Sequence, residues 1–254
     1  MIAILSPAKN LDEDKKNPIS RTSTPQYLDV AEKLANKLSR LSRQDLQELL
    51  SINDNLTDLN YNRYKSWVPA KTVEEGRQAV LSYDGDVYKG LSALSLNMED
   101  LNFAQKKLRI LSGLYGILRP LDLIAPYRLE MSTKIGLSNK KDLYQLWTEK
   151  ITQSLNEALK GDRHKVVLNL ASQEYVKAID TKNLNGQVIT PVFKELKGEE
   201  YRTFFVFVKR ARGMMTRYFL KNKITNPEEL KNFNVDGYAF ADSLSDENSW
   251  VFTR

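Results

Sequence analysis

"KVVLNLA", residues 165–171, is the stretch that decides the fold of this chain. It is an almost uninterrupted apolar run, and such runs are typical of strands that are buried on both faces of a sheet. An amphipathic helix is predicted just before it, over residues 142–159, and residues 188–196 predict another strand after it. This alternation favours a central mixed β-sheet flanked by helices, an α/β fold with α+β-like features.

Local start and stop signals predict further elements. "IAIL" at residues 2–5 indicates a short buried strand. Features typical of helix N-termini include those at Thr24-Pro25, Ser42 and Asn97. The helix that begins after Asn97 is predicted to run to residue 111, and residues 79–91 predict a strand that enters a glycine-bounded turn.

The last third of the chain predicts an antiparallel hairpin. Its two strands, residues 188–196 and 201–209, flank a Lys-Gly-Glu turn. Pro191 cannot donate to a strand ladder, so we expect the first strand to lie at a sheet edge or to contain a bulge. No internal repeat and no break in composition marks a boundary, which predicts a single domain over residues 1–254.

Composition excludes several classes of function. Apolar residues make up 41% of the 254 positions and charged residues 28%, as in ordinary globular proteins. Cysteine is absent and His164 is the only histidine, so thiolate chemistry and cysteine-ligated metals are excluded. His164 is expected to be a surface or structural residue. We predict no metal site and no cofactor, and any metal would need oxygen ligands.

Charge and hydropathy indicate the compartment and the kind of partner. No apolar run approaches the roughly 20 residues that a membrane span needs. The N-terminus has no basic residue before its short apolar run, unlike a secretory signal, so a cytoplasmic location is expected. The net charge of +6 favours acidic partners such as nucleic acid, nucleotides or phosphates.

A basic segment follows the predicted hairpin. Between residues 201 and 225 there is no acidic residue, and seven are basic: Arg202, Lys209, Arg210, Arg212, Arg217, Lys221 and Lys223. The spacings of Arg210, Arg217 and Lys221 place them on one face of a helix. Such a face can bind phosphates, or it can be an ordinary solvated surface. Gly213 either permits a close backbone approach or accommodates packing.

The stretch "LSGLYGILRPLDLIAPYRLEM", residues 111–131, has no simple periodicity. A helix that ends at Gly113 and Gly116, followed by a second helix, would be a helix-hairpin-helix element whose backbone meets a DNA phosphate. The two glycines are one residue further apart than in the usual motif, and Pro120 interrupts the second helix, so a structural turn or a pocket edge is the alternative. Three charged residues follow, either as an ion-pair network or as ligand contacts: Arg119, Arg128 and Glu130.

Polar residues also gather at predicted strand ends. Ligands bind near the carboxyl ends of strands in helix-covered sheets, which predicts a shared pocket. Its candidate residues are Lys9, Asp86, Tyr88, Asn169, Ser172 and Glu174. Matches to a penicillin-binding serine motif, a phosphate-binding loop and a calcium loop all lack required residues.

Seven motifs in this order resemble the YaaA family of bacterial peroxide-stress proteins. They are "LSPAKNLD", "YDGDVYKGL", the stretch at 111–131, "DLYQLW", "NLASQEY", "KRARGMMTRY" and "GYAFAD". The resemblance implies a cytoplasmic protein that confers resistance to hydrogen peroxide by limiting free intracellular iron and the DNA damage it promotes. It also implies a mixed α/β fold with a helix-hairpin-helix and a positively charged cleft, and double-stranded or distorted DNA as ligand.

Carried onto this sequence, the resemblance places the hairpin at residues 111–118, with Gly113 and Gly116. The expected nucleic-acid-binding side chains are Arg119, Arg128, Lys209, Arg210, Arg212 and Arg217. No catalytic residue is carried over. Because soft ligands are nearly absent, tight iron binding by this chain is not expected, and any effect on iron should be indirect.

Three functions are open at the level of sequence. The first is a DNA-binding protein, which is tested by measuring how its affinity for DNA changes with salt concentration. The second is an enzyme acting on a nucleotide, a nucleobase or damaged DNA, with catalytic candidates Lys9, Asp86, Glu130 and Glu174. The third is a regulator acting through a protein partner, and nothing in the sequence points to an exposed apolar surface for such a partner. We expect a monomer with no evident protein partner.

Overall fold

The computed structural model describes residues 1–12 and 19–254. Within these residues a mixed sheet has the strand order β11-β12-β9-β8-β1-β5-β6, and β10 pairs with the end of β9. Its strands are β1 (Ile2–Leu5), β5 (Leu108–Ser112), β6 (Gly116–Leu118), β8 (Val166–Asn169), β9 (Gln187–Lys197), β10 (Glu200–Arg202), β11 (Ala239–Phe240) and β12 (Ser249–Thr253). The predicted mixed sheet is therefore confirmed, and "KVVLNLA" contributes β8 at its centre.

The middle of the sheet is parallel and its margins are antiparallel. β12, β9, β8, β1 and β5 are paired in parallel, whereas β6, β10 and β11 each pair antiparallel. β1 and β8 are buried at every residue. Parallel strands with covered faces need no polar alternation, which is why these strands read as continuous apolar runs.

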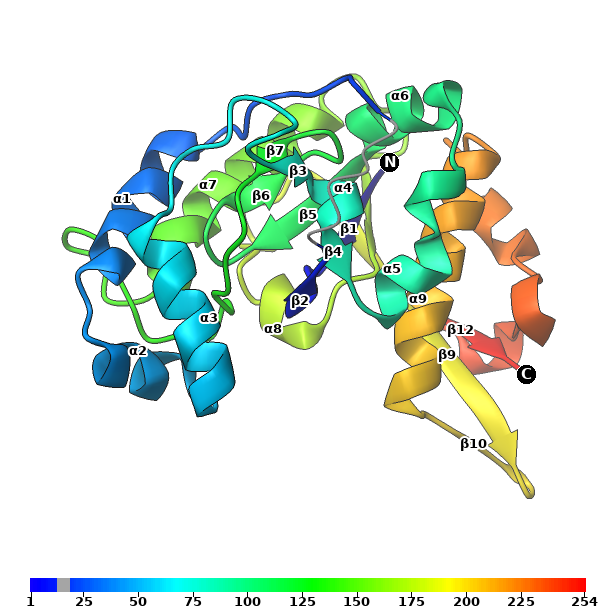
Figure 1. Cartoon of the computed structure of the whole chain (residues 1–254). Coiled ribbons are helices and arrows are strands. Elements are labelled where there is room, and N and C mark those ends of the chain that lie inside the picture. Colours follow the sequence, from blue (N-terminus) through cyan, green and yellow to red (C-terminus); the bar gives the residue numbers. More distant parts are fainter. Residues whose placement is uncertain (13–18) are drawn as a thin grey trace.

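Helices cover this sheet (Figure 1). They are α1 (Leu28–Ser39), α2 (Arg43–Leu50), α3 (Asp54–Lys65), α4 (Ala79–Ser82), α5 (Asp86–Leu91), α6 (Met98–Lys107), α7 (Leu143–Leu159), α8 (Gln173–Val176) and α9 (Phe205–Lys221). Short 3-10 turns are η1 (Ala93–Ser95), η2 (Pro227–Asn232), η3 (Val235–Gly237) and η4 (Asp242–Leu244). α7 packs against β1 and β6, and α9 packs against β9 and α5.

Two small ribbons lie outside the main sheet. β2 (Asn10–Leu11) pairs with β4 (Tyr83–Asp84), and β3 (Arg77–Gln78) pairs with β7 (Leu123–Ile124). The first ribbon ties the segment after β1 to the segment before α5. It therefore holds two polar loops beside the same edge of the sheet.

Capping side chains set several helix boundaries as expected. Ser42, Asn97 and Asp142 each accept a hydrogen bond from a backbone N–H in the first turn of α2, α6 and α7. The start predicted at Thr24-Pro25 is wrong, because a turn intervenes and α1 begins at Leu28.

The expected helix-hairpin-helix is a β-hairpin at this position. α6 ends at Lys107, and the next residues form β5, which turns back antiparallel as β6. The prediction of a helix to residue 111 was wrong because four apolar or basic residues, "LRIL", fit either a helix or a strand by local pattern. Pairing with β1 decides for the strand.

Three other stretches differ from their predictions. Residues 79–91 form α4, β4 and α5 rather than a strand, and residues 205–209 belong to α9 rather than to the second strand of the hairpin. β9 is not an edge strand, because it pairs with β8 and with β12. Pro191 is tolerated since pairing with β8 already ends at Ile189. β9 and β10 project as a hairpin from the body of the molecule (Figure 1).

Candidate functional site

A cavity of about 510 Å³ lies at the carboxyl ends of β1 and β8. After β1 the chain goes on to β5, which lies on one side of β1 in the sheet. After β8, on the other side of β1, it goes on to β9, which lies further away from β1. Connections therefore diverge between these two strands, and ligands bind at such switch points in α/β sheets. The ends are joined directly, because the backbone N–H of Ser172 donates a 2.8 Å hydrogen bond to the Ser6 hydroxyl oxygen.

Segments far apart in sequence line this strand-end pocket. They are residues 6–10, residues 84–89, residues 127–130, residues between 170 and 175, and Lys209 with Arg212 from α9. β2, α5 and α8 lie near this edge of the sheet (Figure 1). The polar cluster predicted at strand ends is thus brought together, with Asn169 just behind it. Asn169 is buried and accepts a hydrogen bond of 3.0 Å from the backbone N–H of Ala171, which fixes the turn after β8.

One wall of the pocket consists of buried tyrosines. The hydroxyl of Tyr127 lies 2.7 Å from the Ser112 hydroxyl and 2.7 Å from that of Tyr83. Tyr88 donates a 2.9 Å hydrogen bond to the Ser6 carbonyl oxygen. Burial raises the pKa of Tyr127 to about 12, although the hydrogen bonds with Ser112 and Tyr83 oppose this shift. The ring is therefore neutral near pH 7, and this wall carries no charge.

Glu130 joins two cations at the pocket. Its Oε2 lies 3.0 Å from Nζ of Lys9, and its Oε1 accepts a 3.3 Å hydrogen bond from Nη2 of Arg128. The Lys9 side chain is 63% exposed, whereas that of Arg128 is only 11% exposed. The carboxylate is thus an arginine's partner, and it also faces a cavity that can accept a ligand. Of the two alternatives left open for Arg128 and Glu130, the ion pair is confirmed, and contact with a ligand stays a prediction.

Glu174 is held at the same pocket by a neighbouring loop. Its Oε1 accepts hydrogen bonds of 3.0 Å from both the backbone N–H and the hydroxyl of Ser132. This contact ties α8 to the segment that follows Glu130. The candidates Lys9, Glu130 and Glu174 therefore line one cavity.

Close packing of α5 on α9 completes the pocket. A side chain at Gly90 would meet the Arg210 carbonyl oxygen at 2.3 Å, and one at Gly213 would meet the Val87 carbonyl oxygen at 1.9 Å. Gly213 therefore serves a close backbone approach. The two helices bring Asp86 of α5 and the basic residues Lys209 and Arg212 of α9 to the same cavity.

The lining is mixed in charge. Among its described residues five are basic, Lys9, Lys89, Arg128, Lys209 and Arg212, and four are acidic, Asp84, Asp86, Glu130 and Glu174. A surface that only gripped a phosphate backbone would not need the carboxylates, because like charges repel the ligand. The arrangement suits an anionic group that arrives together with polar or proton-donating atoms.

The glycine hairpin lies outside the pocket. Gly113 and Gly116 are buried, and Gly116 has a positive φ of 72°. A side chain at Gly116 would meet the Trp147 ring at 2.4 Å, and the Trp147 indole N–H donates a 2.9 Å hydrogen bond to the Gly113 carbonyl oxygen. These glycines contact protein, not an open surface.

Arg119 is also committed to internal contacts. It pairs with Asp122 at 3.0 Å and donates a 2.9 Å hydrogen bond to the Thr24 carbonyl oxygen. Asp122 is buried, and its carboxylate also accepts a hydrogen bond of 2.6 Å from the Ser23 hydroxyl. Of the charges in residues 111–131, only Arg128 and Glu130 reach the cavity.

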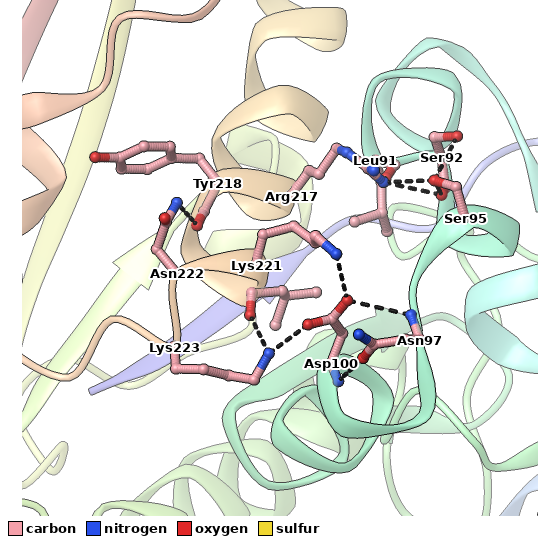
Figure 2. A network of polar contacts seen from close by, with 11 residues as sticks. Leu91, Ser92, Ser95, Asn97, Asp100, Arg217, Tyr218, Lys221, Asn222 and Lys223 are labelled. Atoms are coloured by element: carbon pink, nitrogen blue, oxygen red, sulfur yellow. Dashed lines mark hydrogen bonds and ion pairs between the residues drawn. The ribbon is translucent and has the colours of Figure 1, made fainter.

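The three residues of the predicted basic stripe on α9 do not share one role: Arg217 and Lys221 make internal contacts, and Arg210 is exposed. Figure 2 shows Arg217 pointing to the end of α5, where it donates to the Leu91 and Ser92 carbonyl oxygens at 3.2 Å each. Lys221 pairs with Asp100 of α6 at 2.9 Å. The acidic partner comes from another helix, so its absence from the basic segment was misleading. Arg210 is exposed and does not line the cavity.

Several lining residues were not predicted from sequence. Ser6, Tyr127 and Tyr175 have no distinguishing local pattern, since serine and tyrosine are common in turns and cores. Ser6 did follow a predicted strand, and that position was the available signal. Within residues 1–12 and 19–254, no group of three or more histidine or acidic side chains is arranged to hold a metal ion.

The fold and the pocket define an α/β protein with a mixed-charge pocket at the switch point of its sheet. Residues 1–244 match the family model described as peroxide stress protein YaaA. The chain belongs to this family.

Curated relatives match over the whole length. A UPF0246 protein of Saccharophagus degradans is 50% identical over 254 residues, and one of Dechloromonas aromatica is 48% identical over 254 residues. In both cases the alignment covers 100% of this chain and 99% of the relative. The family resemblance read from the motifs is confirmed. In the part of the chain that the structure describes, no helix has the length and apolar character to cross a membrane.

Proposed function

We propose that this chain is a cytoplasmic DNA-binding protein of the peroxide-stress response, and that DNA contacts it at the strand-end pocket. The observation that carries the proposal is the convergence of Arg128, Lys209 and Arg212 on one cavity. Membership of the peroxide-stress family supports the biological setting. Protection of DNA would follow from occupancy of damaged sites, and an effect on free iron would be indirect, because cysteine is absent and histidine occurs once.

A charge reversal at Lys209 tests this proposal. Lys209 is exposed, so Lys209→Glu should fold normally. Binding of duplex and distorted DNA should weaken several-fold, and the dependence of log affinity on log salt should become shallower by about one unit per lost phosphate contact. Fluorescence anisotropy across a salt series measures both quantities.

Arg163→Glu is the matched control. Arg163 is exposed and precedes β8, at the end of the strand opposite the pocket. The Arg163→Glu variant should bind DNA more tightly than the Lys209→Glu variant does. Wild-type affinity that does not change with salt, or equal losses in the two variants, would remove the electrostatic basis of the proposal.

The acidic residues favour a second candidate, an enzyme that acts on a nucleotide, a nucleobase or damaged DNA in the same pocket. Lys9 and Glu130 lie 3.0 Å apart, and Asp86 and Glu174 line the same cavity. Lysine can act as a nucleophile, and carboxylates can act as general acid or base.

Product analysis separates the two candidates. Wild-type protein is incubated with damaged and undamaged oligonucleotides and with free nucleotides, and products are identified by mass spectrometry. An enzyme should yield a product that Glu130→Gln reduces by roughly 100-fold or more, the usual contribution of a general acid or base. Failure to convert any member of a broad panel would leave DNA binding alone.

A further inference from the structure

Two arginines at the strand-end pocket have donors that no described protein group satisfies. The Nε atoms of Arg128 and Arg212 are buried and have no hydrogen-bond partner among residues 1–12 and 19–254. Arg128 uses Nη2 on Glu130, whereas the guanidinium of Arg212 makes no hydrogen bond or ion pair with any residue in the described parts of the chain. A buried donor without an acceptor is costly, so the pair indicates an acceptor that arrives with a ligand.

The ligand that fits these donors is an anion with several oxygens. Burial lowers the pKa of Arg212 from its usual value, yet a guanidinium stays protonated at neutral pH. Its planar set of N–H donors matches carboxylate and phosphate oxygens better than a point charge does. Lys9 and Lys209 lie at the same pocket and add positive charge.

The size and charge of the pocket limit how many anionic groups can enter. A cavity of about 510 Å³ lies within the range of sites for single small ligands. The carboxylates of Asp84, Asp86, Glu130 and Glu174 line it as well, and they would repel a run of phosphates. One phosphate with its attached nucleotide suits this lining better than a continuous backbone does.

We propose that the pocket binds the terminal phosphate monoester of a DNA strand, held between Arg128 and Arg212, in preference to an internal phosphodiester. This inference rests on the proposed DNA-binding function and assigns its ligand. A monoester carries about −1.5 to −2 charges near pH 7 and three free oxygens, whereas a diester carries one charge and two. The additional charge and oxygen suit two guanidinium groups with unfilled donors.

Binding of matched duplexes tests the inference. Short duplexes that end in 5′-phosphate, in 3′-phosphate or in hydroxyl groups are compared by fluorescence anisotropy. At least one phosphate end should bind roughly ten-fold more tightly than the hydroxyl end, the effect expected of one charge-assisted hydrogen bond. Arg212→Met should abolish this preference, and Arg163→Met should retain it.

Because Arg212→Met changes a partly buried residue, its circular dichroism and thermal unfolding are compared with those of the wild type to detect a folding defect. Lys209→Met at the exposed side of the pocket is the second variant, and it should reduce the preference without affecting folding. Equal affinity of wild type for phosphate and hydroxyl ends would overturn the inference.

Two competitors separate this inference from the function on which it rests. If closed circular duplex DNA, which has no ends, competes as well as phosphate-ended DNA, DNA binding stands and the terminal assignment falls. A second outcome is that no DNA binds, but deoxyadenosine 5′- or 3′-monophosphate or inorganic phosphate raises the melting temperature of the wild-type protein and not that of Arg212→Met. Both DNA assignments then fall. The phosphate would then belong to a free nucleotide. Competition by the monophosphates together with preference for phosphate ends supports the inference.

Discussion

Asp100 is a buried carboxylate that serves as the anchor for the end of α9. Only 3% of its side chain is exposed, and it accepts hydrogen bonds from Lys221, Lys223 and the Asn97 backbone N–H (Figure 2). Burial alone would raise its pKa, but the hydrogen bonds from Lys223, Lys221 and Asn97 outweigh burial and lower the pKa to about 2. The charged form therefore stabilises the junction of α6 with α9.

This carboxylate should make stability depend on acid. Its pKa is lower in the folded chain than the ordinary value of 3.8, so its contribution is complete above about pH 5 and is lost as the pH falls. We expect Asp100→Asn to lower the free energy of unfolding by on the order of 2 kcal/mol near neutral pH, and about half of that difference to disappear by about pH 3.

Urea unfolding followed by circular dichroism measures this difference at each pH. Glu99→Gln is the control, because Glu99 is exposed in the same first turn of α6. It should change the free energy of unfolding little at any pH. A difference for Asp100→Asn that stays constant as the pH falls would show that the charge is not responsible.

At the scale of elements, the crossing of α5 and α9 depends on glycine. By helix propensity alone, Gly213→Ala would stabilise α9 by about 1 kcal/mol. The structure predicts the opposite sign, because the new Cβ would lie 1.9 Å from the Val87 carbonyl oxygen. Separating the helices should cost roughly 1–3 kcal/mol of unfolding free energy. It should also weaken ligand binding, since Asp86 and Arg212 face the pocket from these two helices.

Thermal and urea unfolding of Gly213→Ala measure this effect. Arg210→Ala, at an exposed position of the same helix, reports the effect of helix propensity and charge alone. A variant Gly213→Ala that is more stable than wild type would show that α5 and α9 can separate at no cost.

Elements that were wrongly predicted share a physical cause. Residues 201–209 are rich in aromatic and β-branched side chains, which favour strands, yet α9 begins at Phe205. Phe205 and Val206 remain exposed in α9, so the strand preference of these side chains is not supported by burial against a sheet. Residues 108–111 show the opposite error, a strand where a helix was predicted. They pair with β1 as β5, and a continued helix would leave that edge of β1 unpaired. Short apolar runs fit both periods, and long-range pairing decides between them.

At the scale of the whole molecule, the order of strands creates the pocket. β1 and β8 are adjacent although more than half of the chain separates them. The loops that follow these strands bring Ser6 and Lys9 to the same cavity as Ser172 and Glu174. The segment after β7 then contributes Arg128 and Glu130, and α9 contributes its basic residues from far along the chain.

The sequence by itself determined the mixed helix-covered sheet, a central strand within residues 165–171, the family, and the residue types from which the pocket is built. These properties follow from periodicity, capping and motif order, which are local. Only the tertiary structure decided which charges are free. It buried Gly113 and Gly116 against Trp147, paired Lys221 with Asp100, and left donors of Arg128 and Arg212 unfilled at one cavity. The reason is physical: a charge's availability depends on partners that the fold brings from distant parts of the chain.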